Sequence, residues 1–240
     1  MVGSTIGLTT ALILCKVFIK NPIKKDIVLK IAAILTLILH YSPLYVDFFK
    51  TGSAEIIDTM LLPVYPCNVA MWFLVIVAFC KNKQGKFFKT VAVITFYLGV
   101  IGGILGIAFN EIYSHTPTLA DWDVLHGLLS HVTLLFGCIF VLVGGYIKIR
   151  VSNLIPIFIG EVLLIVDGYL IIGLFTLCGI EPVNCMFLLE PPLANLPWLN
   201  VYVIGVFALI LFFAITALVE QFAVKKGERW YNKIKFRRKK

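Results

Sequence analysis

Residues 201–219 read VYVIGVFALILFFAITALV, an apolar run that contains no charged side chain. A helix needs about 20 such residues to cross the hydrocarbon core of a bilayer. Backbone polar groups in lipid must be satisfied within the segment, so a run of this kind predicts a helix. Working outward from it, we expect helices at residues 3–19, 27–48, 57–80, 88–109, 123–147, 153–178 and 198–223.

The composition of the whole chain supports a membrane protein. Of its 240 residues, 60% are hydrophobic and 14% are charged, whereas soluble domains are about 45–50% apolar and about 25% charged. The sequence therefore predicts an all-α, polytopic membrane protein with seven transmembrane helices. We expect one seven-helix domain over residues 1–223 and a basic tail over residues 224–240.

The distribution of lysine and arginine predicts the orientation. If the C-terminus is cytoplasmic, the loops at 20–26, 81–87 and 148–152 are cytoplasmic as well. These loops, the tail and the adjoining helix ends hold 20 of the 21 basic residues, and only Lys50 lies outside. Cytoplasmic loops of membrane proteins carry this excess. We therefore expect an external N-terminus, a cytoplasmic C-terminus and a multi-pass protein of the plasma membrane.

The net charge of +8 does not predict a nucleic-acid partner, because much of it lies in the tail. A basic tail beside a transmembrane helix attracts anionic lipid of the cytoplasmic leaflet. The expected partners are membrane lipids, with anionic cytoplasmic lipid at the tail, and no nucleic acid. The sequence contains no phosphate-binding loop or dinucleotide fingerprint, and no cofactor is expected.

Six cysteines without CxxC spacing exclude a secreted disulfide scaffold. Cys178 and Cys185 both lie outside in this topology, so the sequence leaves open a disulfide or two free thiols. Four glycines in one predicted helix form two overlapping GxxxG pairs, a spacing that lets helix backbones approach closely. These glycines are Gly99, Gly102, Gly103 and Gly106.

Ionisable and thiol side chains inside the predicted spans are few, and such groups are costly in lipid and often functional. They are His40, Cys67, His126, His131, Glu161 and Asp167. Four of them lie about eight to eleven residues from the outer ends of their helices, which at a rise of about 1.5 Å per residue is nearly one depth. The sequence therefore predicts a polar layer that contains His40, Cys67, His131 and Asp167.

Cys67 follows two prolines, Pro63 and Pro66. Proline belongs in the first turn of a helix and breaks its interior, so we expect the helix to restart here with Cys67 in its first turn. The positive end of a helix favours a thiolate, which makes Cys67 a candidate nucleophile. The alternative interpretation is a small buried hydrophobe beside a kink.

His131 is the candidate base for Cys67, and Asp167 is a candidate to orient its imidazole. Alternatively, His131 is a hydrogen-bonded interhelical histidine and Asp167 is a proton-relay group. Glu161 is expected nearer the cytoplasm. His126 and His131 are five residues apart, about 140° around a helix, so no metal site is predicted from them.

Three segments resemble the YwaF-like family of integral membrane proteins. Residues 62–68, LPVYPCN, resemble its LPxxxC-type segment, and Ser130-His131 resembles its Ser-His segment in the fifth helix. Residues 184–188, NCMFL, precede Pro191-Pro192 and are similar to its Asn-Tyr-Met-Phe-Leu segment. The resemblance covers residues 55–220 in the same order and implies seven spans.

An animal relative of that family is a phospholipid acyltransferase that acts on ether-linked lysophospholipid through an acyl-cysteine, with a histidine borne on a helix. By resemblance, the cysteine corresponds to Cys67 and the histidine to His131, with His126 as the second choice. His126, His40 and Asn184 are the expected substrate-binding residues. Asn184 or the helix-start N–H groups near Cys67 are the expected oxyanion donors.

Three functions remain open from the sequence. The first is a phospholipid or lysophospholipid acyltransferase, or a lipid-ester hydrolase, that uses an acyl-cysteine. The second is a small-solute or ion transporter whose broken helix and buried polar layer form a binding site. The third is a non-catalytic membrane protein that holds a partner or anionic lipid with its basic tail.

Overall fold

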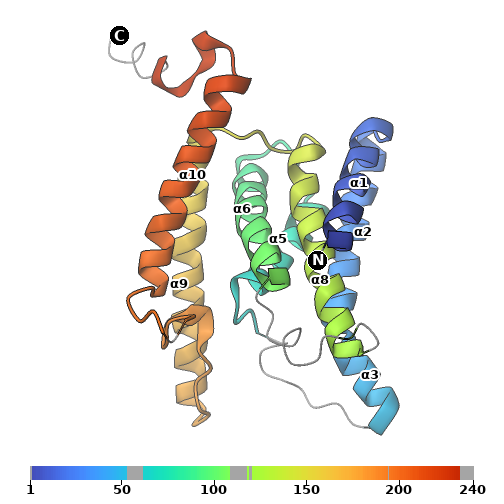
Figure 1. The fold of residues 1–240 in the computed structure, drawn as a ribbon, viewed down its shortest axis with the longest axis vertical. Coiled ribbons are helices and arrows are strands. Elements are labelled where there is room, and N and C mark those ends of the chain that lie inside the picture. Colours follow the sequence, from blue (N-terminus) through green and yellow to red (C-terminus); the bar gives the residue numbers. More distant parts are fainter. Residues whose placement is uncertain (1, 53–61, 109–117, 119–120, 194, 233–240) are drawn as a thin grey trace. The chain divides into compact units, whose positions relative to one another are not determined.

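The computed structural model describes residues 2–52, 62–108, 118, 121–193 and 195–232 (Figure 1). Within these residues every regular element is a helix, which confirms the predicted all-α class. The chain divides into two compact units, Met1–Tyr146 and Ile147–Lys240. Each unit is described separately below.

The first unit is built from six helices among the described residues. They are α1 (Val2–Phe18), α2 (Pro22–His40), α3 (Ser42–Thr51), α5 (Pro66–Phe79), α6 (Lys86–Ala108) and α8 (Trp122–Val143). Asn21 caps α2 by accepting a hydrogen bond from the Ile23 N–H at 2.8 Å, and Pro22 opens its first turn. Both are favoured residues at these positions.

The predicted helix at 27–48 is bent. The axes of α2 and α3 differ by 52°, and the break lies at Tyr41, whose φ and ψ are −90° and 1°. Pro43 follows in the first turn of α3, where a proline cannot donate to the preceding helix. The Ser42 hydroxyl donates to the Leu39 carbonyl at 2.7 Å and satisfies one of the carbonyls released there.

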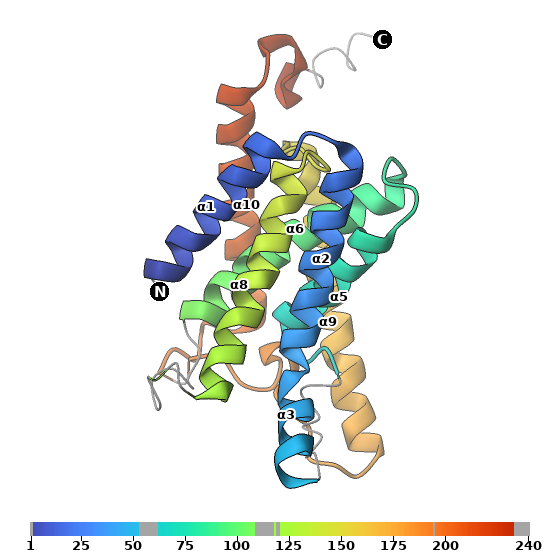
Figure 2. The ribbon, with the colours of Figure 1, turned by 90° about the vertical axis from the view of Figure 1, so that its right-hand side faces the viewer.

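The core of this unit is a bundle of α2, α5, α6 and α8. Helix α5 contacts the other three, while α1 packs against α8, and the two views of the ribbon show α2 beside α8 (Figures 1 and 2). Large side chains are fully buried in the bundle, among them Leu29, Leu74, Ile94 and Phe140. The packing fixes the relative positions of α2, α5 and α8, which carry the candidate site.

The second unit pairs α9 (Leu154–Leu177) with α10 (Val201–Ala223). Short 3₁₀ segments lie at Val151–Asn153, Cys185–Phe187 and Lys226–Glu228. Asn200 caps α10 by accepting from the Val203 N–H at 3.1 Å. The helix boundaries agree with the sequence expectation to within a few residues.

Glu220 fastens the described part of the tail to the end of α10. Its side chain is 2% exposed, and its two carboxylate oxygens accept from the backbone N–H groups of Val151 at 2.8 Å and Trp230 at 2.9 Å. Arg150 lies 3.9 Å from the same carboxylate. Hydrogen bonds and a nearby cation are what a buried carboxylate requires, so this residue orders the chain on both sides.

Four described helices are long and apolar enough to cross a membrane, and the bent α2–α3 pair makes a fifth candidate. They are Lys86–Ala108, Val124–Val143, Val151–Leu177 and Val201–Ala223. Thr5–Phe18 and Pro66–Phe79 are shorter apolar helices. The part of the predicted span 57–80 that covers residues 57–61 lies outside the described residues. The structure thus supports a multi-span protein without fixing seven spans.

Candidate functional site

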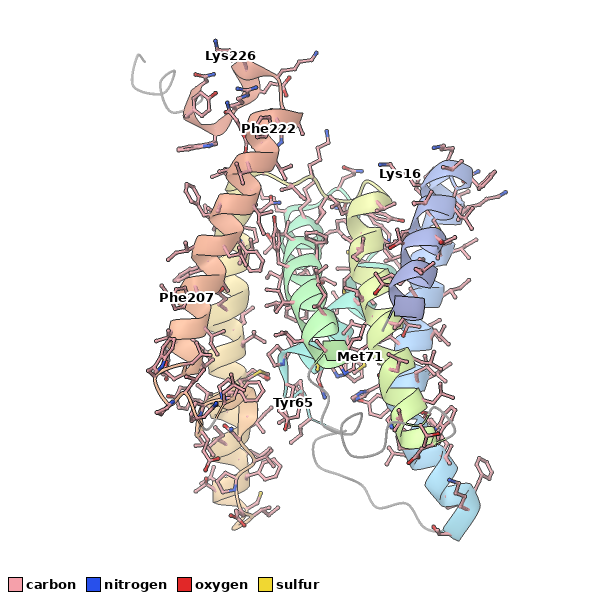
Figure 3. All side chains as sticks on the ribbon, viewed as in Figure 1. Lys16, Tyr65, Met71, Phe207, Phe222 and Lys226 are labelled. Carbon is pink, nitrogen blue, oxygen red and sulfur yellow. The ribbon has the colours of Figure 1, made fainter. Side chains whose placement is uncertain are left out.

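The segment before Cys67 ends one stretch of chain and starts helix α5. Tyr65 is extended, with φ −118° and ψ 155°, and Pro66 occupies the first turn. Proline there loses no hydrogen bond, since the first-turn N–H groups of a helix have no intrahelical partner. Cys67 therefore lies in the first turn, as the two prolines predicted. Figure 3 labels Tyr65 and Met71, which mark this end of α5.

A small cavity of about 20 Å³ brings together three of the predicted residues. It lies among α2, α5 and α8 and is lined by Thr36, His40, Cys67, Asn68, Met71, Ser130, His131 and Leu134. The volume is that of about one water molecule, and its polar lining suits one. The predicted layer is therefore real for His40, Cys67 and His131, which come from three different helices.

Glycines of α6 make room for the thiol and the imidazole. A Cβ added at Gly106 would lie 2.6 Å from His131 Nε2, and one added at Gly102 would lie 3.2 Å from Cys67 Cα. The close approach of His131 and of Cys67 to α6 therefore depends on glycine, which has no side chain, at these two positions. The GxxxG pair predicted to serve helix packing thus holds Cys67 and His131 against the same turn of α6.

The other two glycines of the stripe serve packing alone. A Cβ at Gly99 would lie 3.0 Å from Cys138 Cβ, and one at Gly103 would lie 3.0 Å from Leu135 Cβ. Cys138 and Leu135 are both buried on α8. The stripe therefore divides into a packing pair, Gly99 and Gly103, and a site pair, Gly102 and Gly106.

Asn68 is the site residue that sequence reasoning missed. Its side chain is 6% exposed, and its Oδ1 accepts a hydrogen bond from the Cys67 thiol at 3.2 Å. An amide beside the candidate nucleophile in an otherwise apolar helix was a visible signal. Ser130 and Thr36 also line the cavity, but their hydroxyls donate to helix carbonyls, those of Gly127 at 2.9 Å and Ala32 at 2.8 Å.

Among the described residues, no hydrogen bond joins Cys67 directly to His131; the two face one cavity. Catalytic hydrogen bonds in unliganded enzymes are often long and tighten when substrate binds. Among the first-turn amides, Asn68 and Val69 both donate to the Tyr65 carbonyl, at 2.9 Å and 3.3 Å. The oxyanion donors expected from the helix start are therefore reduced to the N–H of Cys67 itself.

His126 lies apart from the cavity lining. Its ring lies near that of Trp122, which is one turn earlier on α8. The two ring centroids are 6.3 Å apart, and the ring planes differ by 30°. The described lining includes His131 and not His126. The structure thus places His131 in the described lining, and the choice of His131 as the functional histidine stays a prediction. Within the described chain, no group of three or more His, Cys, Asp or Glu side chains is arranged to hold a metal ion.

Asp167 and Glu161 lie on α9 in the second unit, so their relation to Cys67 stays a prediction. Within that unit, Asp167 Oδ2 and Glu161 Oε1 are buried and have no hydrogen-bond partner among the described residues. Glu161 Oε2 would lie 3.8 Å from a Cβ added at Gly205, which places the side chain toward α10. Both are unpaired carboxyl oxygens at apolar positions.

Asn184 holds its own loop. Its Oδ1 accepts from the N–H groups of Leu189 and Glu190, both at 3.1 Å, and its Nδ2 donates to the Glu190 carbonyl at 3.0 Å. These bonds use the amide that we expected to serve as a substrate or oxyanion ligand. Met186 and Phe187 have positive φ values of 53° and 58°, a conformation that non-glycine residues rarely adopt.

Cys178 and Cys185 are both thiols in the structure, which contains no disulfide between them. Cys185 is fully buried, and burial, with the nearby Asp167 charge, raises the pKa of its thiol to about 12. It is therefore a protonated thiol at neutral pH. Met186 contacts the place where Gly168 lacks a side chain, which docks this loop on α9.

The chain is thus an all-helical, multi-pass integral membrane protein with a thiol, two imidazoles and an amide gathered around one buried cavity. The TMEM164 family model matches residues 1–219, and the chain belongs to the TMEM164 family, a family of membrane proteins. No curated protein and no solved structure matches the chain. The YwaF-like assignment and the acyltransferase relation stay predictions.

Proposed function

We propose that this protein is a membrane acyltransferase that moves a fatty acyl group between phospholipids through a thioester on Cys67. The observation that carries the proposal is the single cavity that Cys67, Asn68, His40 and His131 line together. A nucleophile and a base on neighbouring elements, facing one space, are the parts that covalent acyl transfer requires.

In the first half-reaction, Cys67 Sγ attacks the acyl carbonyl carbon of a donor phospholipid. The thiol proton passes to His131, a C–S bond forms, and the ester C–O bond breaks. His131 returns the proton to the departing alkoxide, which leaves as a lysophospholipid hydroxyl. The negative oxygen of the tetrahedral intermediate is stabilised by the backbone N–H of Cys67 and by the side-chain amide of Asn68.

The second half-reaction reverses these steps with a new acceptor. The hydroxyl of an acceptor lysophospholipid attacks the thioester carbonyl and gives its proton to His131. His131 then protonates the Cys67 sulfur as the C–S bond breaks. No cofactor is needed, since the bond energies of ester and thioester pass directly between the two lipids. Water in place of the acceptor gives lipid-ester hydrolysis at the same site.

The experiment is a search for the acyl-enzyme. Protein purified in nanodiscs with native lipids is digested, and the Cys67 peptide is examined by mass spectrometry before and after hydroxylamine. We expect a hydroxylamine-labile fatty acyl mass on Cys67 that disappears in Cys67→Ala. Cys138→Ala is the matched control, because Cys138 is a buried thiol of the same bundle that lies outside the cavity lining. An unmodified Cys67 with every phospholipid donor would contradict acyl transfer.

A transporter is the second candidate, and the buried, unpaired carboxyl oxygens of Asp167 and Glu161 are the observation that favours it. Ionisable groups at such positions mark solute or proton pathways. Transport predicts a flux in proteoliposomes that Cys67→Ala preserves and Asp167→Asn abolishes. The acyltransferase predicts no such flux, and a thioester that Cys67→Ala removes and that Asp167→Asn forms more slowly, because Asp167 orients His131. The absence of both activities leaves the non-catalytic role, in which the tail binds a partner.

The proposed topology has seven spans, with α1 and α5 as short spans and α2–α3 as one bent span. Its N-terminus is external, its C-terminus is cytoplasmic, and the protein lies in the plasma membrane with anionic lipid at the basic tail. Reporter fusions after residues 20, 52, 84, 148 and 232 test the orientation. Signals that place 20, 84, 148 and 232 on one side and 52 on the other agree with it.

A further inference from the structure

A second pocket lies at the opposite end of the first unit from the cavity, where α1, α5 and α8 end and α2 and α6 begin. Residues 16–30 and 81–89, here called the lysine end, hold nine lysines and one carboxylate, Asp26. The pocket has a volume of about 360 Å³, which is within the range of ligand sites, about 300–1,000 Å³. Its lining is Pro22, Ile23, Asp26, Lys30, Phe79, Cys80, Lys81 and Lys83.

The pocket carries a net positive charge that is built into the fold. Its three lysines and single carboxylate give a formal charge of +2. Asp26 lies 2.7 Å from Lys30 and 2.7 Å from Lys83, so it holds two ammonium groups at one wall. Two of the three lysines, Lys30 and Lys83, are therefore held in place by an ion pair.

The three lysines of the pocket differ in their contacts. Lys83 donates to the Val77 and Ala78 carbonyls at 3.0 and 2.9 Å, which pairs the negative end of α5 with a cation. With the Asp26 ion pair, these bonds use its three protons. Lys30, whose side chain is 40% exposed, pairs with Asp26 and lies 5.8 Å from the centroid of the Phe79 ring, so part of its ammonium stays open to solvent. Lys81 is exposed and has no polar partner in the described chain. Lys30 and Lys81 are thus available to an anion.

Apolar side chains border this charged space. Ile23 and Phe79 line the pocket and are exposed, and the exposed Ile27 and Ile31 continue the apolar surface along α2. In a membrane protein such a surface lies against lipid chains. A ligand that fits has an anionic head for the lysines and apolar chains for the adjoining helix face. Basic pockets between transmembrane helices bind phosphate-bearing lipid heads in this way.

We propose that this pocket binds the phosphate head of an anionic membrane lipid, held by Lys30 and Lys81 on a wall fixed by Asp26 and Lys83. The site is separate from the Cys67 cavity. Lys30 and His40 are ten residues apart on α2, or about 15 Å along its axis, so the proposal does not rest on the acyl-transfer reaction. It also differs from the basic tail, because its residues come from α2 and the segment after α5.

The test is a titration of the full chain in detergent with dioleoyl phosphatidic acid, followed by native mass spectrometry. Dioleoyl phosphatidylcholine is the neutral-head comparison, and glycerol 3-phosphate is the soluble phosphate comparison. We expect the first phosphatidic acid molecule to bind more tightly than phosphatidylcholine. Lys30→Gln with Lys81→Gln should weaken it roughly 30-fold, from about 1 kcal/mol per lysine at a membrane surface.

The matched control removes the same charge elsewhere at the lysine end. Lys86 and Lys89 are exposed, lie on α6 and are outside the described pocket lining, so Lys86→Gln with Lys89→Gln should leave the first affinity within about threefold. Equal weakening by both double variants, or none by either, would overturn the pocket. Equal binding of glycerol 3-phosphate would overturn the lipid assignment. If the Lys30 variant does not fold, Lys81→Gln alone should weaken binding about fivefold.

Discussion

The two ends of the first unit use the same helices for opposite kinds of polar site. At the cavity, His40, Cys67 and His131 face one small space with hardly any mutual hydrogen bonds. At the lysine end, Asp26 and Lys83 are tied into ion pairs and carbonyl contacts. Ion pairs tie charged side chains to the fold, whereas titratable side chains gathered around one cavity are candidates for proton transfer. Under the proposed function, the cavity end is the candidate for chemistry and the lysine end is not.

The largest effect should come from the base. Replacing His131 with alanine leaves no imidazole beside Cys67, and loss of a positioned general base costs about 10²–10⁴ in rate. The rate of thioester formation on Cys67 is the measurement. His126→Ala, on the same helix but outside the described lining, should leave the rate nearly unchanged. His40→Ala should fall between the two. A larger loss for His126→Ala would reverse the assignment of the histidines.

The outcome at these histidines shows what the sequence could and could not predict. Counting depth along each helix correctly brought His40, Cys67 and His131 into one layer. The same count placed His131, and not His126, in that layer, but it could not show which face of α8 meets α5, because both faces are apolar. Lipid and protein interiors favour the same residues, so hydrophobicity does not mark the inner face of a span.

The four glycines of α6 also show that sequence spacing does not predict which residues face one another. GxxxG spacing in α6 predicted close packing, which Gly99 and Gly103 confirm, but spacing alone did not reveal that Gly102 and Gly106 face Cys67 and His131. The two prolines, in contrast, correctly predicted that Cys67 lies in the first turn of a helix, because a proline acts through local geometry. The sequence thus predicted where a helix begins, but it did not predict which face of each helix points toward its neighbours.

The second prediction separates the packing glycines from the site glycines. Gly106→Ala should push the His131 imidazole away, and Gly99→Ala should push Cys138. Overpacking costs about 1–3 kcal/mol at either place, so both variants should lose similar thermal stability. Thioester formation should fall by at least about tenfold in Gly106→Ala alone, since misplacement of a catalytic group by about 1 Å is that costly. Equal activity in both variants would contradict the site role of Gly106.

The third prediction concerns the lysine end. Lys83→Met keeps the aliphatic stem but removes the ammonium, which pairs with Asp26, donates to two α5 carbonyls and lies 5.6 Å from the centroid of the Phe88 ring. We expect a loss of about 1–2 kcal/mol in unfolding free energy, measured by titration with a denaturing detergent. Thioester formation on Cys67 should persist at temperatures where the variant is folded. A loss of activity without a loss of stability would show that the two ends are coupled.

The smallest effect should appear at Tyr146, which completes the lysine end. Burial, and then the negative charge of Asp26, raise the pKa of Tyr146 to about 12, and its hydroxyl oxygen is buried without a hydrogen-bond partner among the described residues. An unfolded tyrosine ionises near pH 10. Between about pH 10 and 12 the unfolded chain therefore loses a proton that the folded chain keeps, and stability must fall as the pH rises.

Tyr146→Phe removes this linkage while keeping the ring that Lys83 faces at 5.5 Å. The stabilising contribution is fully present below pH 10, so the variant and the parent should differ by a constant amount there. Above pH 10 the parent should lose stability more steeply than the variant, although lysine deprotonation lowers both. Unfolding in detergent at pH 8, 9.5 and 11 measures the two slopes. Parallel slopes would mean that Tyr146 has the same pKa in the folded protein as in the unfolded chain. In that case the lysines that pair with Asp26 would cancel the effect of its negative charge on Tyr146.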